Sequence, residues 1–485
     1  MTAVPSTVTA SPRLALWVIV FAGSALRTSL LGCVLVAEAA IGETFGLSAG
    51  ALAVLVESIV FGGLVAVFMV PWLVAKVGIR AASQGAAAGT VICLVAALML
   101  APLTSPAVQA QAGLFVVAAL LGFFVAVLSP IAQTLLNDAT TSDPSLNRSL
   151  QSVWSAGQPT GFVLASLLGG ILLERFGWWS ALVTPLAFAG IALLALMDRQ
   201  VLQRAEQHEA EVQPGIRDIA WIIVMLLAFQ VWSTWGSLGS WLEPGVLVTL
   251  LATVIVSVVA LDQLRRSQNP AISPQPFAIP GFAAAALILF VYQLPTTAEF
   301  EVLLLTQLAN MPAEEIGTRT AIGNGGQIAG TALAAVLLLR HRIALALVAG
   351  FGLTLVGLVG YTLYPWWNDF PYTVVTRTIV GFGGGLLTPT LFVLALHQMP
   401  SSLQIAAGTW LVLAMIGGTE IGLALFDIVL EIAAGVSGAK FAGFLAVEVA
   451  QLAVGAAVAL LAAWLTLRGT LLVRASSEPL SNGPA

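Results

Sequence analysis

The sequence predicts an all-α polytopic membrane protein, and three observations lead to this class. About fourteen long apolar segments follow one another along the 485 residues. Apolar residues make up 59% of the chain and charged residues only 8%, whereas soluble proteins carry roughly 25% charged residues. Lysine and arginine gather in every second gap between the segments. Because backbone groups inside lipid must be hydrogen-bonded within the chain, we expect each segment to be a helix.

The apolar segments are long enough to cross the hydrocarbon core of a bilayer, which takes about 20 residues. We expect helices at residues 14–40, 50–74, 82–102, 112–135, 149–173, 178–197, 217–237, 243–262, 278–309, 316–339, 342–363, 371–397, 404–430 and 440–468. Segment 278–309 is the longest and contains Pro295, so we expect a kink or a break in it.

The basic residues in the gaps predict the orientation of the chain in the membrane. An even number of crossings places both termini on one side. The even-numbered gaps and the end of the last segment hold most of the lysine and arginine: Lys76, Arg80, Arg148, Arg199, Arg204, Arg217, Arg265, Arg266, Arg340, Arg342, Arg468 and Arg474. Cytoplasmic loops carry the excess of basic residues. We therefore expect a multi-pass protein of the inner cell membrane with both termini in the cytoplasm.

The polar segment 198–216 divides the chain into unequal parts. We predict a cytoplasmic N-terminus (1–13), an N-terminal six-helix bundle (14–197), a cytoplasmic linker (198–216), two inserted transmembrane helices (217–262), a C-terminal six-helix bundle (278–468) and a cytoplasmic tail (469–485). The inserted helices hold no acidic residue in their interiors, which favours a lipid-facing position. Trp232, Trp235 and Trp241 are expected to anchor their outer ends at the membrane interface.

Several function classes lack the residues they need. The longest basic clusters are too small for a nucleic-acid surface. The three histidines show no metal-ligand spacing, and Cys33 and Cys93 lie in apolar segments as core residues. No GxSxG, HExxH, CxxC or GxxxxGK[ST] motif occurs. We therefore expect no catalytic residue, no metal, no cofactor and no nucleic-acid partner, and we predict that the protein is not an enzyme.

Charged or polar side chains inside the apolar segments are the first candidates for function. A charge in mid-membrane costs roughly 2.5–3.5 kcal/mol on insertion scales, so it usually faces a cavity or a partner. The candidates for carrying protons are Glu57, Glu420, Glu299 and Glu301, and those for binding substrate or switching are Arg27, Arg377 and Gln158. A salt bridge between Arg27 and Glu57 that locks two helices is an equally favoured alternative. Glu448, in the last segment, is expected to face lipid or a supporting layer.

Small residues form a second pattern. Gly157, Gly161, Ala165 and Gly169 recur every four residues in segment 149–173. Such a stripe lets the backbone of another helix approach closely. The same role is expected for Gly170, Gly417 and Gly418. These contacts could also be the ones that move during transport.

Several motifs resemble those of the major facilitator superfamily. The stretch from Pro71 to Arg80 is similar to the loop GxLaDrxGrkr of that family, with Lys76, Gly78 and Arg80 matching and Ala75 in the place of the aspartate. Gly169-Gly170-Ile171-Leu172, followed by Phe176-Gly177-Trp178-Trp179, resembles the signature GPxxGGxL…WRW of the fourteen-helix drug:proton antiporter branch. Met415 to Gly422 resembles RqxGGSxG, with the arginine missing and Glu420 added. Arg27 stands where the branch usually has an acid.

The resemblance implies a fold and a function. The fold is that of two six-helix bundles around a central cavity, with two inserted helices and alternating access by rocking. The implied function is secondary active transport, namely proton-coupled efflux of a small organic or amphiphilic compound. Arg27 would favour an anionic one. The expected partners are the small-molecule substrate, protons, the lipid bilayer and, by analogy with the branch, a periplasmic adaptor.

Two other classes stay open at this point. A receptor or assembly partner that has lost transport is supported by the missing motif charges. A membrane-embedded enzyme that acts on lipids is the least favoured class, because the sequence shows no cluster of catalytic groups.

Overall fold

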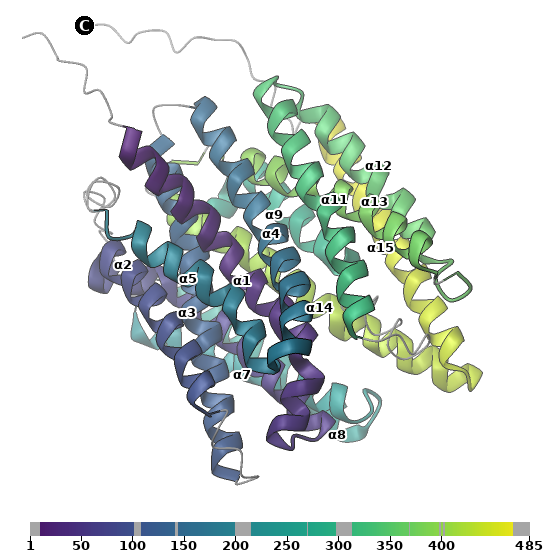
Figure 1. The fold of residues 1–485 in the computed structure, drawn as a ribbon. Helices are drawn as coiled ribbons and strands as arrows, with labels where there is room; N and C mark the ends of the chain where they lie inside the picture. The colour runs from purple at the N-terminus through teal and green to yellow at the C-terminus, as the bar shows by residue number, and fades with distance from the viewer. Residues whose placement is uncertain are drawn as a thin grey trace, which may run out of the picture.

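The computed structural model describes residues 10–100, 108–140, 144–198, 215–268, 270–296, 313–367, 369–396, 399–400 and 403–468. Within these segments the regular elements are α-helices and short 3-10 helices, and no strand occurs. Figure 1 shows α2, α3 and α5 of the first half on one side of the molecule and α12, α13 and α15 of the second half on the other, with α9 and α14 labelled between them. The fold is the all-helical membrane architecture that the composition predicted.

Three groups of elements follow one another along the chain. The first half contains α1 (Ala10–Phe45), α2 (Ala49–Leu100), α3 (Val108–Thr140), α4 (Pro144–Phe176), η2 (Trp178–Leu182) and α5 (Val183–Ala195). The inserted pair is α7 (Ile216–Leu238) and α8 (Pro244–Arg266). The second half contains η3 (Gln275–Ala278), α9 (Pro280–Gln293), η4 (Leu294–Thr296), α11 (Ala313–Leu339), α12 (Ile343–Tyr361), α13 (Phe370–Leu396), α14 (Gln404–Ser437) and α15 (Lys440–Leu467).

Twelve helices in the described part of the chain are long and apolar enough to cross a membrane, and the shorter apolar helix α9 adds to them. The apolar span of α2 is 50 residues long, whereas one crossing needs about 20. Gly78 interrupts α2 with a φ of 81° and a ψ of 156°. This break falls between the predicted helices 50–74 and 82–102, and α2 is long enough for two crossings.

Segment 278–309 was expected to bend at its proline. The α-helix α9 ends at Gln293, and Pro295 lies in the 3-10 helix η4 that follows it. Proline has no N–H to donate and its ring collides with the preceding turn, so the α-helix ends before it. The candidates Glu299 and Glu301 lie outside the described residues.

The helices of the two halves pack in a related way. In the first half α1 packs along α4 and α2 along α3, while in the second half α9 packs along α14 and α11 along α13. The halves meet on two flanks, where α4 packs on α11 and α2 on α14. Helix α7 packs on α2 at this second flank, and contacts α14 less extensively. The inserted pair therefore covers the α2–α14 flank and leaves the α4–α11 flank to direct contact.

One face of the inserted pair is exposed and apolar. Val248, Leu251 and Ile255 of α8 are 66%, 61% and 55% exposed. In a membrane this face meets lipid. The expectation that the tryptophans anchor the outer ends is wrong for two of them, because Trp232 and Trp241 are only 8% and 5% exposed, whereas Trp235 is 46% exposed. Their rings pack on each other and on Ala424 of α14 instead.

Candidate functional site

A cavity of about 590 Å³ lies on the α2–α14 flank, between the inserted pair and both halves. This volume falls in the range that holds drug-sized ligands, about 300–1,000 Å³. Its walls come from α2, α7, α8, η3, α9 and α14, and none of its lining residues belongs to α4 or α11. The lining residues are Leu64, Phe68, Met225, Leu226, Phe229, Ser257, Phe277, Ala283, Ala286, Leu287, Phe290, Trp410, Leu413, Ala414, Gly417, Glu420 and Ile421.

The chemistry of this cavity is apolar, with one charged residue. Glu420 of α14 is the charged side chain among the lining residues, and Ser257 of α8 adds a hydroxyl. The indole N–H of Trp410 donates a hydrogen bond to the backbone carbonyl of Ser273 at 3.0 Å, so it is directed away from a ligand. An apolar wall with a single carboxylate suits a ligand that has an apolar body and a positive or hydrogen-bond-donating group.

Two glycines of α14 shape the wall next to Glu420. A Cβ at Gly418 would come within 2.4 Å of the backbone oxygen of Phe290, so this glycine allows α9 and α14 to approach closely. Gly417 lines the cavity, and a Cβ there would be 3.8 Å from the Phe290 ring. The motif around residues 417 and 418 therefore holds α9 against α14 and leaves space for a ligand beside them.

The other proton candidate, Glu57, lies in α2 but does not line the cavity. Its carboxylate accepts a hydrogen bond from the amide of Gln230 of α7. The same amide donates to the hydroxyl of Thr234 at 3.2 Å. Gln230 follows Phe229, which lines the cavity. Glu57 therefore holds α7 in place directly beside Phe229, which forms part of the cavity wall.

Arg27 lies apart from the large cavity. It lines a small hollow with Ile59 and Gly63 of α2, Gly122 of α3 and Ile416 of α14. This hollow lies where α1, α2, α3 and α14 meet. The neighbouring Thr28 donates a hydrogen bond to the backbone oxygen of Gln158 in α4 at 2.6 Å. Gln158 therefore joins α4 to α1 through its backbone, and its side chain is half-buried.

Arg377 lies inside the second half rather than in the cavity. It is 5% exposed, and its Nη1 donates to the hydroxyl of Tyr361 at 3.2 Å. Its side chain covers Gly323 of α11, where a Cβ would lie 1.9 Å from the Arg377 Cγ. The guanidinium thus joins α13 to α12 while its stem packs on α11.

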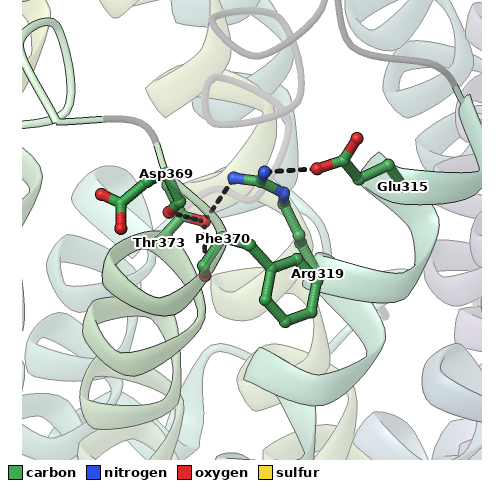
Figure 2. Close-up of polar contacts among 5 residues, drawn as sticks. All are labelled: Glu315, Arg319, Asp369, Phe370 and Thr373. Atoms are coloured by element: carbon green, nitrogen blue, oxygen red, sulfur yellow. Dashed lines mark hydrogen bonds and ion pairs between the residues drawn. The ribbon is translucent and has the colours of Figure 1, made fainter.

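A second buried arginine lies at the same end of α11 and α13 (Figure 2). Arg319 pairs with Glu315 at 2.5 Å and donates to the hydroxyl of Thr373 at 2.8 Å. Its guanidinium carbon lies 5.2 Å from the centre of the Phe370 ring, which is within the range of a cation–π contact. Glu315 and Arg319 both belong to α11, whereas Thr373 and Phe370 belong to α13, so the contacts of Arg319 with Thr373 and Phe370 join the two helices.

The glycine stripe of α4 contacts α1 over part of its length. A Cβ at Gly157 would lie 1.9 Å from the Ser24 hydroxyl, and one at Gly161 would lie 2.2 Å from the backbone oxygen of Ala25. At Gly169 and Gly170 a Cβ would make ordinary contacts at 3.7 and 3.8 Å. Within the stripe, the glycines that allow the close approach of α1 are therefore Gly157 and Gly161.

Sequence reasoning missed two acidic residues of α14. Asp427 lies inside the predicted segment 404–430 but was not singled out, and Glu431 lies one residue beyond that segment, whereas α14 continues to Ser437. Both carboxylates accept hydrogen bonds from the turn between α7 and α8. The signal that could have found them is their spacing, because residues 420, 424, 427 and 431 recur on one face of a helix.

Residues 16–419 match the model of the Major Facilitator Superfamily. The chain belongs to this superfamily. The match covers the first half, the inserted pair and most of the second half. Proteins of the Major Facilitator Superfamily with known structures have the same arrangement. The proton:xylose symporter XylE aligns with a TM-score of 0.63 at 13% identity over 94% of this chain and 95% of XylE. The human organic anion transporter MFSD10 aligns with a TM-score of 0.61 at 14% identity, over 93% and 99% of the two chains.

Two superfamily members with curated names are similar in sequence. The puromycin resistance protein of Streptomyces alboniger is 27% identical over 356 residues, which are 68% of this chain and 66% of that protein. The methyl viologen resistance protein SmvA of Salmonella typhimurium is 24% identical over 310 residues, 62% and 60% of the two chains. The chain thus aligns with about two thirds of the length of these relatives. Membership of this superfamily makes the multi-pass protein a transporter rather than an enzyme.

Proposed function

We propose that this transporter exports small amphiphilic compounds that combine an apolar body with a cationic or hydrogen-bond-donating group. The observation that carries the proposal is the 590 Å³ cavity, whose one charged lining residue is Glu420. Methyl viologen is a dication and puromycin carries an amine, and the names of two relatives refer to resistance to these compounds. Arg27, which favoured an anionic compound in the sequence, lines a different hollow.

The driving force in this proposal is the proton gradient across the inner membrane. The Glu420 carboxylate can bind either a proton or the positive group of the substrate, but not both at once. Because binding of one excludes the other, uptake of a proton can be coupled to release of the substrate. Glu57 is the second candidate for carrying protons, because its carboxylate is hydrogen-bonded to the inserted helix α7. We place both termini in the cytoplasm, from the positive-inside rule, and the α7–α8 turn at the opposite face. The chain then belongs to the fourteen-helix antiporter branch.

The test is transport into inverted membrane vesicles that contain the full-length protein. Puromycin and methyl viologen uptake is followed with and without an imposed pH gradient, for the parent and for Glu420→Gln. Glu174→Gln is the matched control, because Glu174 is an exposed carboxylate at the end of α4. We expect Glu420→Gln to reduce uptake at least tenfold and to abolish its response to the pH gradient. A Glu420→Gln protein with the parent's uptake and pH response would show that Glu420 has no part in coupling.

The preference for positive charge has its own test in the same vesicles. Uptake is compared among apolar compounds of similar size that are cationic, neutral or anionic. With Glu420 in the cavity wall, we expect cationic compounds to be transported best and anionic ones least. A transporter that prefers the anionic compound would assign substrate binding to Arg27 instead.

A further inference from the structure

The face of α14 that meets the inserted pair forms a continuous stripe. Glu420, Ala424, Asp427 and Glu431 follow one another at spacings of four, three and four residues, which places them on one side of the helix. Glu420 lines the cavity. Ala424 packs with Trp232 and Trp241 of the inserted pair. The stripe therefore runs from the cavity to the α7–α8 turn.

The α7–α8 turn is hydrogen-bonded to the far end of this stripe. The indole N–H of Trp241 donates to Asp427 at 2.8 Å, and the backbone N–H of Trp241 donates to Glu431 at 2.7 Å. The hydroxyl of Ser240 donates to the second oxygen of Glu431. Two carboxylates of α14 thus accept three hydrogen bonds from two consecutive residues of the turn.

A chain of rings leads from this turn back to the cavity. The Trp241 ring lies edge-on to Trp232 with their centres 5.2 Å apart, and Trp232 lies 5.7 Å from Phe229. Phe229 lines the cavity. Aromatic pairs at these separations attract each other by more than their buried area accounts for. The position of Trp241 is therefore passed on through two ring contacts to the wall of the cavity.

The backbone of α7 leaves space for this chain of rings at Gly236. A Cβ at Gly236 would come within 2.3 Å of the Trp241 ring. Met225, Phe229, Trp232 and Gly236 recur at four, three and four residues, so they form the face of α7 that matches the α14 stripe. Gln230, one residue beyond Phe229, is bonded to Glu57 of the first half. The inserted pair is thus bonded to the first half at Gln230 and to α14 at the α7–α8 turn, and Phe229 of the cavity wall directly precedes Gln230.

We propose that Asp427 and Trp241 are positioning residues for the substrate: through Trp232 they set the place of Phe229 and so determine how closely the cavity wall fits the ligand. The part that concerns the substrate rests on the proposed function. Two carboxylates are costly among apolar helices, and apolar contacts alone would hold a fixed turn equally well. Hydrogen bonds that break and re-form fit a wall that moves during transport.

The first test needs no ligand. The parent is the full-length protein in nanodiscs with Cys33 and Cys93 replaced by alanine and Ser257→Cys, in α8, as a reporter in the cavity wall. The rate of its modification by N-ethylmaleimide is measured alone and with Asp427→Leu, Trp241→Phe or both. Asp427→Leu removes the acceptor, and Trp241→Phe removes the donor while keeping a ring. We expect each to raise the rate at least threefold, and the double variant to match the larger single effect because both remove the same bond.

Three further variants separate positioning from loss of folding. Asp427→Asn keeps an oxygen that accepts from the Trp241 indole, and Trp235→Phe makes the same ring change on an exposed tryptophan of α7. Both are expected to stay within twofold of the parent. Gly236→Ala keeps both bonding groups and favours the helix, but it displaces the Trp241 ring, so it should raise the rate as Asp427→Leu does. Unchanged rates in Asp427→Leu and Gly236→Ala would overturn the proposal.

The second test measures puromycin transport by the same variants in vesicles that keep Ser257. We expect Asp427→Leu and Trp241→Phe to raise the KM for puromycin at least fivefold while the maximal rate stays within twofold, and Asp427→Asn to resemble the parent. Faster labelling with an unchanged KM would overturn the role in substrate binding. If the variants are labelled faster but neither the parent nor any variant transports puromycin, the proposed function is refuted. The coupling of the turn to the cavity wall would still stand.

Discussion

Gln230 of α7 donates a hydrogen bond to the carboxylate of Glu57 in α2, and this bond attaches the inserted pair to the first half. Two roles follow for Glu57, and they make different demands on the side chain. A structural role needs only an acceptor for Gln230, which glutamine also supplies. A role in proton coupling needs a group that can lose its proton.

Variants of Glu57 distinguish these roles. Hydrogen bonds between membrane helices contribute about 0.6–2 kcal/mol, so we expect Glu57→Leu to lower the free energy of unfolding by about 1–2 kcal/mol. Glu57→Gln should cost less than about 1 kcal/mol. Thermal unfolding can be followed with a dye that reacts with Cys33 and Cys93, since both cysteines are free and buried. Vesicle uptake by Glu57→Gln then decides the coupling role, because a stable variant that keeps the parent's response to pH carries no proton through Glu57.

Gly161 tests the contact between α1 and α4. A Cβ there would lie 2.2 Å from the backbone oxygen of Ala25, and a backbone atom cannot rotate away as a side chain can. We expect Gly161→Ala to separate the two helices and to cost about 2 kcal/mol or more. Gly190→Ala in α5 is the control, because nothing lies within 4 Å of its Cβ position, and it should be neutral or stabilising by up to about 1 kcal/mol. Equal unfolding temperatures for the two variants would show that α1 adapts to the added methyl group.

Gly78 tests the break in α2 separately from packing. Its φ of 81° and ψ of 156° lie in a region that only glycine adopts readily, while nothing lies within 4 Å of its Cβ position. The cost of Gly78→Ala is therefore one of backbone conformation, about 1–3 kcal/mol. Gly85→Ala, at an open helical position of the same element, should lack this cost. If both variants unfold at the same temperature, the chain can make the break without a glycine.

The helices themselves could be predicted because a membrane demands a simple pattern. Runs of apolar residues identified the spans, and Pro295 identified one break, whereas the break at Gly78 falls in the gap predicted between segments 50–74 and 82–102. The end of α14 was missed by seven residues, because the predicted segment 404–430 stops just before Glu431, and Asp427 inside it was not singled out. Their hydrogen-bond partners lie in the α7–α8 turn, 186 to 191 residues earlier in the chain. No local pattern shows such a contact.

The candidate site was predictable only in part. Glu420 could be singled out because a carboxylate in an apolar helix is costly and therefore usually faces a cavity or a partner. That it lines a cavity beside the inserted pair depends on how α7 and α8 lie against α2 and α14, which the hydropathy does not contain. Trp241 shows the same limit. Near the end of a predicted span it resembles an interfacial anchor, whereas its indole N–H is bonded to Asp427.

Two ion pairs with the same spacing allow the effect of burial on the stability contribution of an ion pair to be measured. Glu315 and Arg319 of α11 are four residues apart, as are Asp262 and Arg266 of α8. The Arg319 side chain is 4% exposed and the Arg266 side chain 74% exposed. Breaking a buried pair costs about 3–5 kcal/mol and an exposed one about 0–1 kcal/mol. Because the Glu315 side chain is 40% exposed, we expect Glu315→Gln to cost about 1–2 kcal/mol and Asp262→Asn less than about 0.5 kcal/mol.

The remaining contacts of Arg319 set the size of this difference. In Glu315→Gln the Arg319 guanidinium keeps its hydrogen bond to Thr373 and its cation–π contact with the Phe370 ring. Its charge is therefore not left in a purely apolar site. Thr373→Val in the Glu315→Gln background removes one of these contacts and should cost more than it does alone, since both residues contact the same guanidinium. Thermal unfolding of the single and double variants measures this coupling. Strictly additive effects would show that Arg319 can move to water when Glu315 is changed, and that the arrangement in Figure 2 does not hold the charge inside the bundle.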